Sequence, residues 1–124
     1  MAADIAIFEK GSLFHASVLP IGGEHVTNDI AVGLRTPINQ AEKIKVEHGV
    51  ARLSLVPDDA FFQLPTVGGQ KEKTVSKATL AGIIEPRVQE ILAMIDREIK
   101  KAGYGSVLPG GVVLTGGSSL LPGI

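Results

Sequence analysis

The sequence predicts a mixed α/β fold in one small domain. Strand-like apolar runs bounded by glycine occur near both ends of the chain, and apolar residues at helical spacing occur between them. The chain has 124 residues, of which 44% are hydrophobic and only 4% aromatic, so we expect one modest core of aliphatic side chains. Strands from both chain ends should share one sheet, while the middle of the chain forms a second layer.

The first 21 residues predict a β-hairpin. Residues 5–8 and 13–21 are the two strand-like runs, and residues 9–12 between them contain a glycine that suits a tight turn. Gly22 and Gly23 then end the second strand and allow the backbone to turn sharply.

Two helices are predicted after this glycine pair. In the first helix, apolar side chains recur at every fourth position, at Val26, Ile30 and Leu34. Thr36 and Pro37 favour the start of a second helix, which we expect to run to His48 and to end at Gly49.

A second strand pair is predicted in the middle of the chain. Residues 49–56 and 61–67 are strand-like, and Pro57, Asp58 and Asp59 between them suit a turn. Residues 68–73 are polar and begin with glycine, which predicts a loop.

The longest helical pattern lies between residues 75 and 103, where an apolar stripe advances by three or four residues. Pro86 cannot donate a backbone hydrogen bond, so this helix should kink or divide into two at that position. The segment 110–114 then predicts a buried strand, which leads through a glycine turn into the start of a further helix.

Charge and composition exclude several classes of function. With 12 Lys+Arg against 13 Asp+Glu the net charge is −1, so no electrostatic argument favours a nucleic-acid partner. The absence of cysteine excludes disulfides, thiol nucleophiles and Cys-ligated zinc. Neither a signal peptide nor a membrane-spanning run is recognisable, so a soluble, intracellular chain is expected.

Two groups of residues could bind a small ligand. Gly116, Gly117 and Ser118 follow a strand-like run, where free backbone N–H groups would allow a flat or anionic ligand to approach. The alternative is a turn that only needs positive φ, for which double glycines are common. Glu42 and Lys45 share one helical face and could hold ribose hydroxyls or a ring nitrogen, or could be ordinary solvated charges.

Arg87 follows Pro86 on the face of the long helix that the apolar stripe leaves free. Its guanidinium could anchor a carboxylate of a partner peptide, or could simply be solvated. We predict no metal site and no catalytic residue, because no serine lies in a nucleophile elbow and no histidine has a close second ligand; the histidines are His15, His25 and His48.

Several stretches resemble, in the same order, the FtsA family of actin-like bacterial cell-division proteins. Residues 19–31 read LPIGGEHVTNDIA, residues 33–37 read GLRTP and residues 41–45 read AEKIK. Residues 84–87 read IEPR and residues 112–124 read VVLTGGSSLLPGI. The resemblance covers essentially the whole chain, and the stretch VTNDIA is its most diagnostic part.

The resemblance implies part of one lobe of an actin-like ATPase, a ribonuclease H-like fold. Residues 1–23 and 106–124 would belong to the inner subdomain IIA, and residues 24–105 would form an inserted α/β outer subdomain, IIB. The family binds ATP between two lobes and hydrolyses it weakly; Mg²⁺ is expected only in the intact protein, and this chain alone should be inactive. The family also assembles into filaments and tethers the FtsZ ring to the cytoplasmic face of the membrane at the division septum.

The resemblance further implies an adenosine site on this chain, built from Gly22 and Gly23, from Glu42 and Lys45, and from Gly116, Gly117 and Ser118. It places Arg87 in the outer subdomain that receives the C-terminal peptide of FtsZ.

Departures from the family pattern predict that the chain is a fragment comprising most of the second lobe. Met1, Ala2 and Ala3 stand where the family has a glycine- and threonine-rich phosphate loop, and the first lobe and the C-terminal amphipathic membrane helix are missing. ATP binding by the chain alone should therefore be weak or undetectable. Two alternatives stay open: an ATPase or kinase relative completed by another chain, and a structural α/β module that binds no ligand.

Overall fold

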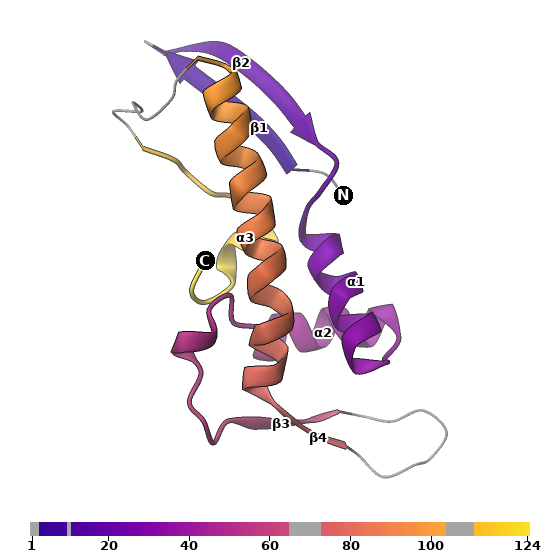
Figure 1. Ribbon diagram of the computed structural model, residues 1–124. Coiled ribbons are helices and arrows are strands. Elements are labelled where there is room, and N and C mark those ends of the chain that lie inside the picture. The colour runs from indigo at the N-terminus through magenta and orange to yellow at the C-terminus, as the bar shows by residue number, and fades with distance from the viewer. Residues whose placement is uncertain (1–2, 10, 65–72, 104–110) are drawn as a thin grey trace.

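Two antiparallel hairpins lie toward opposite ends of one long helix (Figure 1). Of the two shorter helices, the first packs against the long helix and the second packs on the first. The computed structural model describes residues 3–9, 11–64, 73–103 and 111–124. The elements, in chain order, are β1 (Ala3–Glu9), β2 (Ser12–Leu19), α1 (Gly23–Leu34), α2 (Ile38–His48), the 3₁₀ turn η1 (Leu53–Leu55), β3 (Phe61–Leu64), β4 (Lys73–Ser76), α3 (Lys77–Lys101) and the 3₁₀ turn η2 (Gly117–Leu120). The mixed α/β class is as predicted.

The predicted first hairpin is confirmed. Strands β1 and β2 pair in antiparallel register, with Ile5 opposite Ser17 and Ile7 opposite His15, and the register shifts by a bulge after Ile7. Gly11 takes a φ of +79° in the turn, a conformation that glycine adopts without strain. The second strand ends at Leu19, two residues earlier than expected.

The two predicted short helices are also confirmed, with α1 starting at Gly23 and α2 ending at His48. Gly49 ends α2 as expected, but its φ of −66° is not left-handed. A side chain there would instead overlap the Lys45 carbonyl oxygen and come within 3.2 Å of Ile84 Cδ1. Gly49 is therefore required mainly by the close approach of the Lys45 carbonyl oxygen, and not by a left-handed backbone.

The predicted pairing of residues 49–56 with residues 61–67 is wrong. Strand β3 pairs instead with β4, with Phe62 opposite Val75. Backbone groups of the segment 49–56 bond to other parts of the chain: Ala51 N donates to Pro122 O at 2.8 Å, and Leu53 N donates to Glu85 Oε2 at 3.1 Å. Strand β4 begins at Lys73, inside the predicted loop, and the rest of that loop lies outside the described residues.

The long helix α3 continues through Pro86 as one element of 25 residues, so the predicted division into two helices is wrong. Its N-terminus is capped by Ser76, whose hydroxyl accepts a hydrogen bond from Ala78 N at 3.1 Å. Leu80 and Ile84 before the proline and Val88 after it are all buried, so packing supports the helix on both sides of the missing hydrogen bond. The kink at Pro86, the other expected outcome, stays a prediction.

The predicted buried strand near the C-terminus is wrong for its described residues. Val112, Val113 and Leu114 form no strand and are exposed, Val113 by 86%. Hairpins β1–β2 and β3–β4 are separate two-stranded sheets, so within the described part of the chain the two ends share no sheet. The predicted final helix is only the 3₁₀ turn η2. An apolar segment becomes a buried strand only when neighbours cover its edges and faces.

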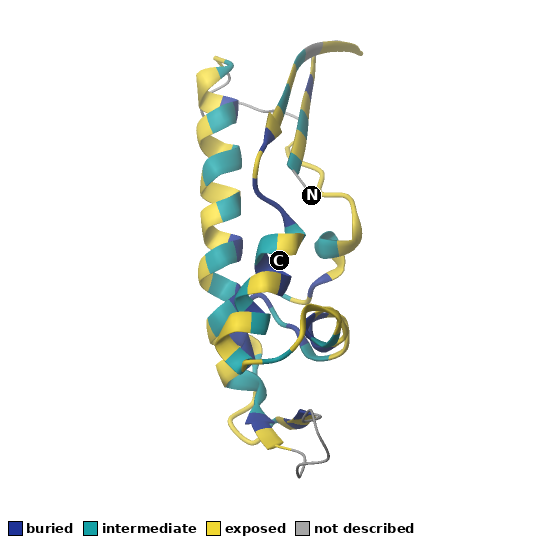
Figure 2. Ribbon diagram, turned by 90° about the vertical axis from the view of Figure 1, so that its right-hand side faces the viewer, coloured by how far each residue is buried: buried dark blue, intermediate teal, exposed yellow. Residues whose placement is uncertain are grey.

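The core lies where α1, α2 and α3 meet the β3–β4 hairpin, and the side of α3 that faces away from the other helices is largely exposed (Figure 2). As predicted, its side chains are mainly aliphatic: Val26, Ile30, Ala41, Ile44, Ala51, Leu64, Val75, Leu80, Ile84, Val88 and Leu121, with Phe62 the single aromatic member among the described residues. Leu121 brings the C-terminal segment into this core.

Candidate functional site

Two polar side chains are buried where α1 packs on α2. Thr27 of α1 is 4% exposed and Lys45 of α2 is 7% exposed. Lys45 Nζ donates to Thr27 Oγ1 at 2.9 Å and to Gly23 O at 3.3 Å, and it lies 3.0 Å from Glu42 Oε2. Each of the three ammonium protons therefore has an acceptor, which offsets the cost of burying the charge.

The Thr27 hydroxyl connects the two helices. Its oxygen lies 2.5 Å from Glu42 Oε2 and 3.2 Å from Gly23 O. A hydroxyl has one proton, and the shorter contact to the charged oxygen is the stronger, so Thr27 donates to Glu42 while it accepts from Lys45.

Glu42 lies at the edge of this cluster, with 52% of its side chain exposed. Hydrogen bonds from Thr27, and after it from Lys45, hold the pKa of the Glu42 carboxyl below its ordinary value. Both contacts fall on Oε2. Among the residues that the structure describes, Oε1 has no hydrogen-bond partner, so this oxygen can accept hydrogen bonds from a ligand.

The C-terminal turn η2 reaches the same cluster. A side chain at Gly23 would overlap Ser118 Oγ, and its Cβ would come within 3.7 Å of Lys45 Nζ. Gly23 thus permits a close approach that alanine would prevent. Next to this contact, Gly116 (φ +95°) and Gly117 are exposed, with no atom within 4 Å of a Cβ built on either.

Gly22 has a different role from Gly23, since it caps α1. Its N–H donates to His25 Nδ1 at 3.0 Å, and its carbonyl accepts from His25 N at 3.0 Å. The structure therefore brings together four of the seven predicted cofactor-binding residues, Gly23, Glu42, Lys45 and Ser118. Gly22, Gly116 and Gly117 adjoin them along the chain.

The sequence predicted that Glu42 and Lys45 share a face, but not that Lys45 is buried. The simple alternative of a solvated lysine is wrong. Thr27 was missed, although the sequence carries a signal for it: a polar residue one position after Val26 and one turn after Gly23, on the buried side of an amphipathic helix.

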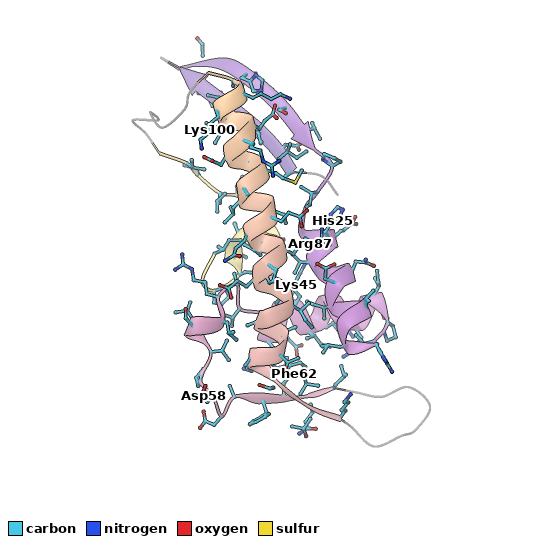
Figure 3. All side chains as sticks on the ribbon, viewed as in Figure 1. His25, Lys45, Asp58, Phe62, Arg87 and Lys100 are labelled. Carbon is cyan, nitrogen blue, oxygen red and sulfur yellow. The ribbon has the colours of Figure 1, made fainter. Side chains whose placement is uncertain are left out.

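Arg87 is engaged within the protein rather than lying on a free face. Its Nε contacts Asp29 Oδ2 at 2.7 Å, its Nη2 contacts Asp29 Oδ1 at 3.0 Å, and its Nη1 contacts Glu90 Oε2 at 3.3 Å. The Asp29 hydrogen bonds raise the pKa of the guanidinium. Figure 3 marks Arg87 and Lys45 near the middle of the molecule, where the helices meet. The role of Arg87 in binding a partner peptide stays a prediction.

In the described ranges, no group of three or more His, Asp or Glu side chains could hold a metal ion. No helix there is both long enough and apolar enough to span a membrane.

Comparison with known proteins gives one consistent family. The family model described as cell division protein FtsA matches residues 2–124. FtsA of Pseudomonas aeruginosa is 41% identical over 120 residues, which cover 97% of this chain and 29% of the relative. FtsA of Bacillus subtilis is 40% identical over 120 residues, covering 97% and 27%, and FtsA of Escherichia coli K12 is 40% identical over 128 residues, covering 98% and 30%. The chain thus spans less than a third of the length of these relatives.

Proposed function

Since the chain belongs to the FtsA family of cell division proteins, we propose that it is part of an ATP-binding, actin-like scaffold and carries half of an adenosine site. The observation that supports this most is the cluster in which Thr27, Glu42 and Lys45 meet Gly23 and Ser118. This cluster joins segments far apart in the chain. Next to it lie Glu42 Oε1, which has no partner among the described residues, and the exposed pair Gly116 and Gly117.

In this proposal each part of the cluster contacts a different part of the nucleoside. Glu42 Oε1 accepts hydrogen bonds from the ribose hydroxyls, which are donors of the kind that a free carboxylate oxygen prefers. Gly116 and Gly117 have no side chains to obstruct a flat base. Lys45 stays buried, because its protons are already satisfied. These residues fit a nucleoside; the phosphates and Mg²⁺ would be held by parts of the longer protein.

For the whole protein, the proposal includes filament formation, attachment of the FtsZ ring, and a position at the cytoplasmic face of the division septum. Membrane contact would be made through a C-terminal helix outside this chain. Arg87 is the proposed anchor for the C-terminal peptide of FtsZ. Because Asp29 occupies the same guanidinium, a carboxylate of the peptide would have to compete with Asp29.

Calorimetry with ATP tests the proposed adenosine site on two proteins: the 124-residue chain and a full-length protein that contains it. We expect binding by the full-length protein, weaker binding after Glu42→Ala, and little change after Lys43→Ala, an exposed neighbour on α2. Lack of binding by the full-length protein would refute the proposed function. Micromolar affinity of the short chain alone would refute the claim that its site is only half complete.

A further inference from the structure

We propose that Thr27 is the positioning residue of this site, which fixes the Glu42 carboxylate so that Oε1 faces the ribose; this inference rests on the proposed function. Thr27 would not touch the nucleoside itself. It would act through Glu42 and Lys45, which it joins by hydrogen bonds of 2.5 and 2.9 Å between heavy atoms.

Thr27 and Lys45 meet at a buried polar contact. Thr27 and Lys45 are the buried polar or charged residues of the described structure, and they contact each other directly. A buried ammonium without fixed acceptors is strongly unfavourable, so Lys45 keeps its position only while its partners keep theirs. At 2.9 Å, the bond to Thr27 is the shortest of its three contacts.

Contacts with Thr27 and Lys45 restrict the Glu42 side chain. A glutamate with 52% of its side chain exposed would sample several rotamers, and binding a ligand would require it to give up that freedom. Thr27 comes from a different helix, so its bond fixes the carboxylate relative to α1 as well as to α2. Because Thr27 and Lys45 both use Oε2, the oxygen left for the ligand is Oε1.

The Thr27 side chain is itself restricted. A β-branched residue inside a helix has few χ1 rotamers. Lys45, which donates to the Thr27 hydroxyl, also donates to the Gly23 carbonyl oxygen at 3.3 Å. Gly23 is the residue against which Ser118 packs. Thr27 therefore links the position of Glu42 to the segment that carries Gly116 and Gly117.

The test compares Thr27→Val, which has nearly the same shape without the hydroxyl, with Thr27→Ser, which keeps the hydroxyl, in a full-length protein containing this chain. We expect Thr27→Val to weaken adenosine binding roughly 10-fold, as for the loss of one charge-assisted hydrogen bond, and Thr27→Ser to restore most of the affinity. Affinity for 2′,3′-dideoxyadenosine, which lacks both hydroxyls, should be nearly the same in all three proteins. A merely structural role of Thr27 would weaken both ligands alike, and that result would overturn the inference.

Thr27→Val leaves the Lys45 charge short of an acceptor and could prevent folding. A second comparison avoids this, because Lys45→Met removes the buried charge. The inference expects the double variant Lys45→Met/Thr27→Val to bind adenosine more weakly than Lys45→Met alone, since Glu42 then loses its last hydrogen bond. Equal affinities would overturn it.

The two proposals fail in different ways. An unaltered full-length protein that binds no adenosine would remove the proposed function, and this inference with it. An unaltered protein that binds adenosine, together with a Thr27→Val variant that binds it equally well, would remove only the inference about Thr27.

Discussion

Arg87 of α3 and Asp29 of α1 form a two-point ion pair, with Nε 2.7 Å from Oδ2 and Nη2 3.0 Å from Oδ1. The side chains are 28% and 26% exposed, so the pair is only partly screened by solvent. Their separation of 58 residues along the chain makes the pair a tertiary link between the two helices.

Arg87→Ala should lower the free energy of unfolding by roughly 1 kcal/mol, because it removes two charge-assisted hydrogen bonds at a half-buried site. Arg87→Lys should recover little of this loss, since an ammonium cannot reproduce the paired geometry. Urea unfolding measures both effects. The matched control is Lys100→Ala, which breaks a pair to Asp96 whose side chains are both 59% exposed and should cost less than about 0.5 kcal/mol. Equal losses in the two alanine variants would contradict the prediction.

Asp29→Asn should strengthen binding of the FtsZ C-terminal peptide, because it removes the carboxylate that competes for Arg87. Amide chemical shifts around Arg87 report the binding. We expect them to move on addition of peptide to the unaltered chain, to move at lower peptide concentration in Asp29→Asn, and to stay unchanged in Arg87→Ala. Unchanged shifts in the unaltered chain at high peptide concentration would show that Arg87 is not the anchor.

Gly23→Ala should destabilise the protein and displace η2, because the new methyl group would occupy the position of Ser118 Oγ. The double variant Gly23→Ala/Ser118→Ala should recover most of the stability, since Ser118 Cβ is 3.5 Å from the new methyl, an ordinary contact. As a control, Gly82→Ala meets nothing within 4 Å and should stabilise α3 by about 0.5–1 kcal/mol. Thermal unfolding of the unaltered protein, Gly23→Ala, Gly23→Ala/Ser118→Ala and Gly82→Ala tests this prediction. A double variant no more stable than Gly23→Ala would rule out the Ser118 contact as the cause of the destabilisation.

Stability should fall as the solution becomes acidic. The pKa of Glu42 is lowered by Thr27 and then Lys45, and that of Glu98 is lowered mainly by a hydrogen bond from Ser17. A carboxyl group with a lowered folded-state pKa stabilises the fold above its ordinary value of 4.5, and this contribution is lost as the pH falls through the folded-state pKa.

Urea unfolding between about pH 6 and pH 3 measures this dependence. We expect the free energy of unfolding to decline below about pH 4.5, and Glu42→Gln and Glu98→Gln each to make the decline shallower. A decline that is equally steep in both variants would show that other groups cause it.

Gly117→Ala should leave folding nearly unchanged and weaken adenosine binding by the full-length protein. Its Cβ would point into open space, and the φ of Gly117 is not in the left-handed region, so the backbone tolerates alanine. A ligand that lies against this turn would meet the new methyl group. Gly116→Ala is a poorer probe, because a φ of +95° would add backbone strain. Unchanged adenosine affinity in Gly117→Ala would place the ligand elsewhere.

The elements that the sequence predicted correctly are those whose signals are local. The β1–β2 turn contains Gly11, and α1 and α2 have amphipathic stripes, with Gly22 before α1 and Gly49 after α2. The predicted cap of α2 at Thr36 is wrong, because Pro37 takes the N-cap position and no side chain caps the helix. The errors at residues 49–56 and 112–114 concern apolar segments whose structure depends on distant partners. Ala51, for example, bonds to Pro122, which no local pattern could indicate.

The candidate site also combines features with a local sequence signal and features that depend on distant contacts. Spacing along one helix was enough to place Glu42 and Lys45 on one face. The burial of Lys45 follows from the packing of α1 against α2, and its partner Thr27 lies 18 residues away. Pro86 shows the opposite case, in which a strong local signal for a break is overridden because the core holds residues on both sides of it.

The satisfied ammonium of Lys45 also determines how the chain responds to reagents that modify lysine. Acylating reagents attack a neutral, solvent-accessible amine, and Lys45 is 7% exposed with its protons directed at Gly23, Thr27 and Glu42. Exposed lysines such as Lys43 and Lys100 should be labelled first. Mass spectrometry of the labelled chain therefore gives a simple index of integrity: modification of Lys45 marks molecules in which α1 and α2 have separated.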